Sequence, residues 1–283
     1  MTDDGGKKHS IAFGPVPSRR LGNSLGINSI PYKVCSYGCI YCQVGRTTQL
    51  EIARQAFYAP STVFQEVREK LAAIHNAGHR VDYLTFVPDG DPTLDINLGD
   101  QIDRVKTLAV PIGVLTNGSL AGNPRVREAL AKADLVSIKV DAVQPKTWRQ
   151  INRPHKALRL LRILEGIAEF ASAFSGKLIT ETLLVKGIND TAACLSRIAK
   201  YIGGLNPQVA YLSAPIRPPT VSWVRVPDEE QLNLAYQIFT DRGLQTEYLV
   251  GYEGDAFSST GDIKNYILST TAVHPMRKNA LEV

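Results

Sequence analysis

From Tyr58 onward, the sequence alternates between strand-like and helix-like segments, with no low-complexity tract between them. The helix-like segments repeat apolar residues at helical spacing, as at Val63, Val67, Leu71 and Ile74. The expected strands cover residues 81–87, 112–116, 135–140, 178–185 and 209–213. The expected helices cover residues 62–78, 97–108, 124–133, 146–174, 191–202 and 228–242.

Strands that are joined by helical crossovers pair in parallel. With one further strand just before Cys35, the pattern amounts to about six strand–helix units. The sequence therefore predicts an α/β fold with a partial (β/α)6 TIM-like barrel, while a flat doubly wound sheet fits the same alternation. In either architecture, functional residues are expected at the carboxyl ends of the strands.

The two terminal segments do not follow the alternation. Residues 1–30 are rich in Pro and Gly, which predicts an irregular segment that covers the barrel, with Arg19 and Arg20 as candidate anion contacts. The barrel is expected over residues 31–245. Residues 246–283 are expected to form a helical C-terminal extension that packs on the barrel.

Three of the four cysteines lie within the stretch KVCSYGCIYC, at Cys35, Cys39 and Cys42. A structural zinc site normally has four protein ligands, and no histidine lies near these thiols. Cys194 belongs to a helix-like segment, where buried packing is its expected role. A 4Fe-4S cluster on three thiolates keeps one iron open for a small molecule with an amine and a carboxylate. The spacing favours such a cluster, with a non-catalytic zinc-binding module as the alternative.

The composition is typical of a cytoplasmic globular protein. Four cysteines in 283 residues are too few for a disulfide scaffold and indicate a reducing compartment. The N-terminus lacks the apolar region of a signal peptide, and no apolar run approaches the roughly 20 residues of a membrane span. The formal net charge of +5 favours an acidic partner, such as a small electron carrier or nucleic acid.

The motif Cys-x3-Cys-x2-Cys, with the aromatic Tyr41 before the last cysteine, resembles the signature of the radical S-adenosylmethionine (radical SAM) superfamily. The resemblance implies that Cys35, Cys39 and Cys42 bind a 4Fe-4S cluster whose open iron binds S-adenosylmethionine. It also implies reductive cleavage of this cofactor to methionine and a 5′-deoxyadenosyl radical. The electron would come from a small protein of the flavodoxin or ferredoxin type.

Three segments at expected strand ends resemble cofactor-binding segments of that family. Residues 88–94 correspond to its Gly-Gly-Glu-like segment, with Asp in place of Glu, and residues 115–119 to its Thr-Asn-Gly segment. In the fourth expected strand, polar residues alternate along one face. The resemblance implies cofactor contacts by Tyr41, Gly90, Asp91, Asn117, Ser137, Lys139 and Asp141. Ordinary turns and a buried Lys–Asp pair fit the same residues.

Two further segments, residues 151–155 and 214–219, place arginine among prolines. A proline-stiffened loop holds a guanidinium in place for a carboxylate or phosphate. We therefore expect Arg153, His155 and Arg217 to bind an anionic substrate, and a rigid loop with solvated cations is the alternative.

The segments PSRRLG, PDGDPTL, INRPH and RPP resemble the wyosine-synthase-related branch of the superfamily. Wyosine synthases modify transfer RNA and hold a second cluster on additional N-terminal cysteines, and no cysteine precedes Cys35 here. A single cluster is therefore expected. A wyosine-type tRNA reaction and the activation of a glycyl-radical partner protein stay open, so the substrate is a small molecule, a protein or tRNA.

Overall fold

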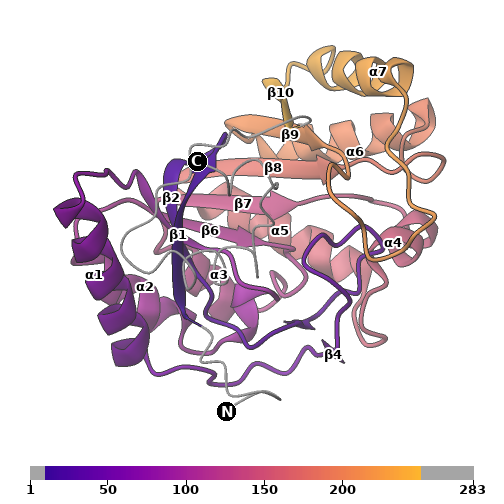
Figure 1. The fold of residues 1–283 in the computed structure, drawn as a ribbon. Coiled ribbons are helices and arrows are strands. Elements are labelled where there is room, and N and C mark those ends of the chain that lie inside the picture. The colour runs from indigo at the N-terminus through magenta and orange to yellow at the C-terminus, as the bar shows by residue number, and fades with distance from the viewer. Residues whose placement is uncertain (1–9, 250–283) are drawn as a thin grey trace.

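The computed structural model describes residues 10–249, which form an eight-stranded sheet with helices packed against it (Figure 1). The strands of this sheet, in spatial order, are β1 (Ala12–Ser18), β2 (Gly22–Ile27), β5 (Tyr83–Phe86), β6 (Ile112–Thr116), β7 (Leu135–Lys139), β8 (Lys177–Leu183), β9 (Val209–Ser213) and β10 (Thr246–Leu249). The helices are α1 (Pro60–Asn76), the short 3-10 helix η1 (Pro92–Leu94), α2 (Leu98–Lys106), α3 (Pro124–Leu130), α4 (Pro145–Asn152), α5 (Leu160–Ala173), α6 (Ala192–Leu205) and α7 (Glu229–Thr240). Neighbouring strands from β2 to β10 are parallel, and β1 is antiparallel to β2.

The expected alternation of strands and helices is confirmed from β2 to β10. Helix α1 buries an apolar stripe that consists of Val63, Val67, Leu71 and Ile74, which are at most 5% exposed, and it packs against β1 and β2. The sheet curls without closing, so that β1 and β10 form its two edges. The prediction of a partial TIM-like barrel is thus confirmed. No helix within residues 10–249 combines the length and the apolar character that crossing a membrane requires.

The prediction of an irregular N-terminal segment over residues 1–30 is wrong for residues 12–27. Residues 12–27 contain the hairpin β1–β2, and β2 pairs with β5, so that Leu25 lies opposite Leu84. Gly26 allows this arrangement, because a Cβ at that position would lie 2.1 Å from the ring of Phe13. Glycine and proline are therefore used here for close packing within a sheet.

The first barrel strand is accordingly β2, and the segment just before Cys35 is not part of the barrel sheet. That segment, β3 (Val34–Cys35), pairs with β4 (Gln49–Leu50) in a separate two-stranded sheet. The chain thus folds back on itself directly after the cysteines, and β4 holds the start of the cysteine loop in place.

Two other boundaries differ from the predictions. The helix expected over residues 146–174 is divided into α4 and α5, because Arg153 has a left-handed backbone with φ of 44° and Pro154 follows it. Residues 246–249 form β10 within the sheet, so the expected barrel boundary at residue 245 is wrong. The remainder of the expected C-terminal extension lies outside the described residues.

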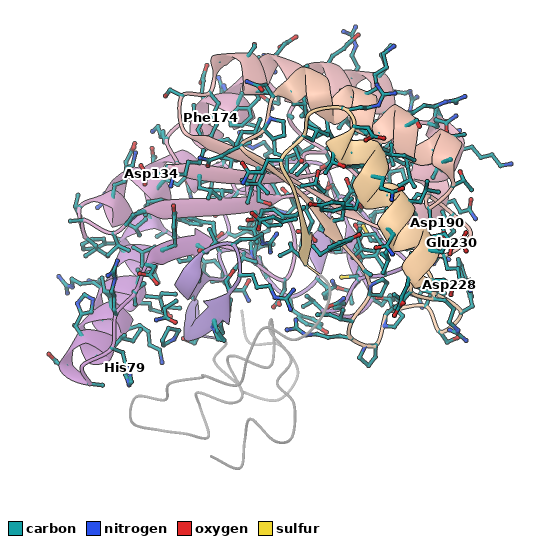
Figure 2. The ribbon with its side chains drawn as sticks, turned by 90° about the horizontal axis from the view of Figure 1, so that it is seen from above. His79, Asp134, Phe174, Asp190, Asp228 and Glu230 are labelled. Atoms are coloured by element: carbon teal, nitrogen blue, oxygen red, sulfur yellow. The ribbon has the colours of Figure 1, made fainter. Side chains whose placement is uncertain are left out.

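Because the barrel strands are parallel, their carboxyl ends lie at the same edge of the sheet. In Figure 2, Asp134 and Phe174, which precede β7 and β8, lie on the opposite side of the molecule from Asp190 and Asp228, which follow β8 and β9. The loops at the second side are the ones that hold ligands in folds of this kind.

Candidate functional site

The three cysteines of the KVCSYGCIYC stretch lie on the loop that starts at β3, and all three line a cavity of about 360 Å³. Each cysteine is half-buried. The other walls of the cavity come from β1 and from residues at or near the carboxyl ends of β5 to β9. The cavity is therefore enclosed by the barrel, with the cysteine loop on one side.

Two loops from the far half of the barrel hold the cysteine loop in place. Gly38 N–H donates to the carbonyl of Asn152 at 3.0 Å, at the end of α4. On the loop after β9, the N–H and hydroxyl of Thr220 donate to the carbonyl of Cys42 at 3.1 and 2.7 Å. The positions of the thiols therefore depend on segments more than a hundred residues away in the sequence.

Each of the three sulfurs has a nitrogen donor within hydrogen-bond distance. The Nζ of Lys33 lies 3.1 Å from the Sγ of Cys42. Asn152 Nδ2 lies 3.4 Å from the Sγ of Cys39, and Asn117 Nδ2 lies 3.6 Å from that of Cys35. Sulfur accepts weakly as a thiol and strongly as a thiolate, so the amide of Asn152 lowers the pKa of Cys39.

Burial acts in the opposite direction on two of these thiols. It raises the pKa of Cys35 to about 12, with the charge of Asp91 as a further cause. Burial and then the charge of Asp141 likewise raise the pKa of Cys39 to about 12. A metal that binds here must therefore displace protons, which is the usual course for thiolate sites.

The donor set fits an iron–sulfur cluster. In the described part of the chain, no group of three or more His, Cys, Asp or Glu side chains is close enough together to hold a single metal ion. A cluster binds each thiolate to a different iron, so its ligands need not converge on one point. Three thiols on one loop, each facing the same cavity and each with a nitrogen donor, meet that requirement.

Gly90, on the loop after β5, packs directly against the strand that leads into the cysteine loop. A Cβ at this position would lie 1.7 Å from the carbonyl oxygen of Val34 and 3.0 Å from the side chain of Ile30. Only a residue without a side chain allows this approach. Gly90 therefore sets the distance between the loop after β5 and the cysteines.

The carboxylate of Asp91 accepts hydrogen bonds from other residues of the protein. It accepts hydrogen bonds from the backbone N–H and hydroxyl of Thr93, from the hydroxyl of Thr116 at 2.9 Å and from the N–H of Asn117 at 2.7 Å. Burial raises the pKa of Asp91, although these donors stabilise its charged form. Asp91 thus ties the loop after β5 to the end of β6, where Asn117 also reaches Ser36 at 2.9 Å.

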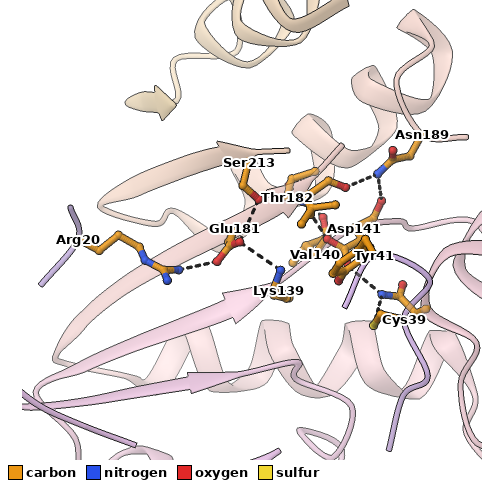
Figure 3. Close-up of polar contacts among 12 residues, drawn as sticks. Arg20, Cys39, Tyr41, Lys139, Val140, Asp141, Glu181, Thr182, Asn189 and Ser213 are labelled. Carbon is orange, nitrogen blue, oxygen red and sulfur yellow. Dashed lines mark hydrogen bonds and ion pairs between the residues drawn. The ribbon is translucent and has the colours of Figure 1, made fainter. Parts of the chain in front are cut away.

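A charged network crosses the cavity wall opposite the cysteines (Figure 3). Glu181 on β8 pairs with Arg20 at 2.5 Å and with Lys139 on β7 at 3.1 Å, and it accepts from the hydroxyl of Ser213 at 2.9 Å. Burial alone would raise the pKa of Glu181, but the two cations outweigh it and lower the pKa to about 2. The ammonium of Lys139 also lies 4.9 Å from the centre of the Tyr41 ring.

Asp141 connects the cysteine loop to the barrel. It is 3% exposed, and it accepts hydrogen bonds from the hydroxyl of Tyr41, from Asn152 Nδ2 at 2.7 Å and from the N–H of Leu183 at 2.9 Å (Figure 3). Asn189 Nδ2 donates to its backbone carbonyl at 3.0 Å. With these partners, Asp141 fixes the position of the aromatic residue that precedes the last cysteine.

Comparison with known proteins identifies the family. The family model of the radical SAM superfamily matches residues 29–194. The chain belongs to the radical SAM superfamily. A UPF0026 protein of Methanocaldococcus jannaschii is 46% identical over 275 residues, which are 96% of this chain and 85% of that protein.

Two solved structures share the radical SAM fold with this chain. A radical SAM methyltransferase from Sphaerobacter thermophilus has a TM-score of 0.60 at 16% identity and covers 84% of this chain and 70% of its own. A structure of TYW1 with a lysine-pyruvate adduct bound has a TM-score of 0.56 at 16% identity and covers 77% of this chain and 73% of its own. At these identities the likeness shows the fold. The expected family and fold are confirmed.

Membership of the radical SAM superfamily makes the chain an enzyme and implies an iron–sulfur cluster, S-adenosylmethionine, a reductant and a substrate. Most of the residues predicted from the sequence to bind the radical SAM cofactors line the cavity. These are Cys35, Cys39, Cys42, Tyr41, Gly90, Asp91, Asn117, Ser137 and Lys139. Arg217, on the loop after β9, lines the cavity as well. The separate signals in the sequence thus meet at one place.

Arg153 and His155, predicted to bind substrate, and Asp141 do not line this cavity. Arg153 is exposed, and its carbonyl accepts from Gly38 N–H at 3.1 Å. The N–H of His155 donates to the carbonyl of Ser36 at 3.0 Å. The segment 151–155 therefore holds the radical SAM cysteine loop through its backbone, and the side chains of Arg153 and His155 do not line the cavity.

The sequence analysis missed Lys33, Asn152 and Glu181. A signal for Glu181 was present, since it is the one charged residue in the apolar strand expected over residues 178–185, and a buried charge needs a partner. Arg20 was predicted to contact an anion, and its partner proves to be this carboxylate. Lys33 and Asn152 reach the sulfurs only through the tertiary fold.

Proposed function

We propose that Cys35, Cys39 and Cys42 hold the single 4Fe-4S cluster of a radical SAM enzyme that acts on an anionic substrate. The observation that carries the proposal is the cavity onto which all three sulfurs face, each with a nitrogen donor. When bound, such a cluster supplies one electron that cleaves S-adenosylmethionine to methionine and a 5′-deoxyadenosyl radical.

The residues that line the cavity position the cofactor and exclude water from it. Gly90, Asn117 and Ser137 offer small or polar groups on the cavity wall near the cysteines, and we assign them to cofactor binding together with Tyr41. Asp91 acts on the cofactor indirectly, because its carboxylate accepts hydrogen bonds from Thr93, Thr116 and Asn117. Asp141 has the same indirect role for the cysteine loop. Phe13, Val16 and Pro17 of β1 line the remaining wall, and these apolar residues limit the access of water.

We assign to Lys139, in its protonated form, the binding of a carboxylate. Burial alone would lower its pKa, but Glu181 and Asp141 outweigh burial and raise it. An amine that is held protonated in this way is a poor nucleophile. This argues against a covalent adduct of the kind named for TYW1 on Lys139 itself.

The cations on the cavity wall support the proposal that the substrate is an anion. Arg217 lines the cavity from the loop after β9, and Arg20 lines it from the hairpin β1–β2. Guanidinium groups bind carboxylates and phosphates through two parallel hydrogen bonds. We further propose that an acidic carrier of the flavodoxin or ferredoxin type delivers the electron, and that the enzyme works in the cytoplasm.

Anaerobic reconstitution with iron and sulfide tests the proposal. We expect about four irons per chain, a brown protein, and release of 5′-deoxyadenosine and methionine after reduction with dithionite in the presence of S-adenosylmethionine. Cys35→Ala, Cys39→Ala and Cys42→Ala should each lose the cluster, whereas Cys194→Ala should keep it. A protein that binds only zinc under these conditions, or a reduced cluster that never cleaves the cofactor, would contradict the proposal.

A further inference from the structure

Lys33 is a buried lysine next to the candidate cluster ligands. It is 2% exposed, and its backbone is held in the left-handed region with φ of 57°. The N–H groups of Thr48 and Gln49 donate to its carbonyl at 3.2 and 3.3 Å. The chain that returns from the cysteine loop thus fixes Lys33, whose Nζ lies 3.1 Å from the Sγ of Cys42.

The charge of Lys33 has no carboxylate partner among the residues that the structure describes, since none of their ion pairs includes it. This distinguishes it from Lys139, the lysine that lines the cavity, which pairs with Glu181. A buried ammonium without an anion is strongly unfavourable. The negative charge that this position requires must therefore come from the sulfur of Cys42 and from what the cysteines bind.

We propose that Lys33 is a positioning residue that raises the reduction potential of the metal centre, an inference that rests on the proposed function. Reduction adds one electron, and hence one negative charge, to a centre that Cys42 binds. A fixed cation at 3.1 Å from a ligand sulfur stabilises the reduced form more than the oxidised form. The cluster should therefore accept an electron more readily with Lys33 than without it.

The three sulfurs differ in the donors that they receive. Asn152 and Asn117 approach Cys39 and Cys35 with neutral amides at 3.4 and 3.6 Å. Lys33 approaches Cys42 with a full charge at a shorter distance. Charge-assisted hydrogen bonds are roughly twice as strong as neutral ones. Lys33 is thus the donor whose loss should change the potential most.

The test is a redox titration of the reconstituted protein, followed by the electron paramagnetic resonance signal of the reduced cluster. Lys33→Met removes the charge with an unbranched side chain of similar length. We expect at least a tenfold lower ratio of reduced to oxidised cluster at a fixed solution potential, which is about 59 mV for one electron. Lys33→Arg keeps the charge and should stay close to wild type. Lys186→Met is the control, because Lys186 pairs with Asp228 and is 49% exposed.

The possible outcomes separate the two proposals. A Lys33→Met cluster with the wild-type potential would overturn this inference alone, and a wild-type protein without any cluster would overturn the proposed function together with it. If Lys33→Met assembles no cluster while Lys33→Arg assembles one with the wild-type potential, the requirement for charge is supported. If both variants lose the cluster, Lys33 acts only in packing and the inference fails.

Discussion

Arg20 and Glu181 are 161 residues apart in the sequence and form an ion pair on the wall of the cavity. Arg20 belongs to the turn of the hairpin β1–β2, and Glu181 belongs to β8 on another side of the barrel. Their side chains are only 16% and 11% exposed, so solvent screens the pair weakly. The hairpin is therefore part of the cavity wall, and this ion pair ties its turn to β8.

Glu181→Gln is expected to destabilise the protein at neutral pH by about 3 kcal/mol, because two half-buried cations, Arg20 and Lys139, lose their common anion. The thermal midpoint of unfolding measures the effect. The matched control is Asp228→Asn, which removes the exposed partner of Lys186 and should cost less than about 1 kcal/mol. Equal losses in the two variants would mean that the buried network adds nothing specific.

The same carboxylate predicts a dependence on pH. The pKa of Glu181 is lowered from 4.5 to about 2, because Lys139 and Arg20 outweigh the effect of burial. A lowered pKa contributes stability above the unfolded value, and this stability is lost as the pH falls through the folded value. The difference in midpoint between wild type and Glu181→Gln should therefore shrink between pH 4.5 and about 2. A difference that stays constant over this range would contradict the assignment.

Asp91→Ala is expected to weaken cofactor binding more than cluster assembly. The substitution leaves the N–H of Asn117 and the hydroxyl of Thr116 without their acceptor. Asn117, which lines the cavity, is then no longer held in position by this hydrogen bond. An unsatisfied buried group costs about 1–3 kcal/mol, so the affinity for S-adenosylmethionine should fall about tenfold or more. Anaerobic calorimetry measures the affinity, and iron analysis should return the wild-type content. Parallel loss of iron would place Asp91 in cluster assembly instead.

Gly90→Ala is expected to disturb the cysteine loop. The added Cβ would lie 1.7 Å from the carbonyl oxygen of Val34, so the backbone just before Cys35 must move. We expect lower iron content and a lower thermal midpoint. Gly203→Ala on α6 is the control, because nothing lies within 4 Å of its Cβ position and alanine favours a helix by about 1 kcal/mol. A Gly90→Ala protein with full iron content would show that this loop adjusts freely.

Arg217→Gln is expected to impair substrate binding and to spare cofactor cleavage. Loss of a bidentate contact to a bound anion costs about 2 kcal/mol or more, which is well over tenfold in affinity. A thermal-shift screen of small carboxylates and phosphates on the wild type identifies ligands, and these should lose their effect on the variant. Release of 5′-deoxyadenosine without substrate should stay within about twofold of wild type. The reverse result would move Arg217 to the cofactor side of the cavity.

Local patterns in the sequence were sufficient to predict the architecture and to indicate the three candidate metal ligands. Helical spacing at residues such as Val63 and Val67 is imposed by the sheet that each helix covers, so it predicts the alternation of strands and helices. The spacing of Cys35, Cys39 and Cys42 is likewise a local property, since all three lie on one loop. The N-terminal hairpin was not predictable in this way, because its glycines are explained by contacts such as Gly26 against Phe13.

The surroundings of the three thiols were decided by the tertiary structure alone. Asn152 reaches Cys39 only because α4 ends at Arg153, and Lys33 reaches Cys42 only because the loop folds back on β3. Glu181 has its ion-pair partner in Arg20, which lies 161 residues earlier in the chain. Such pairings depend on how the sheet curls and have no fixed spacing in the sequence. The sequence alone therefore determined which residues can bind a cluster, and the fold determined which charges surround it.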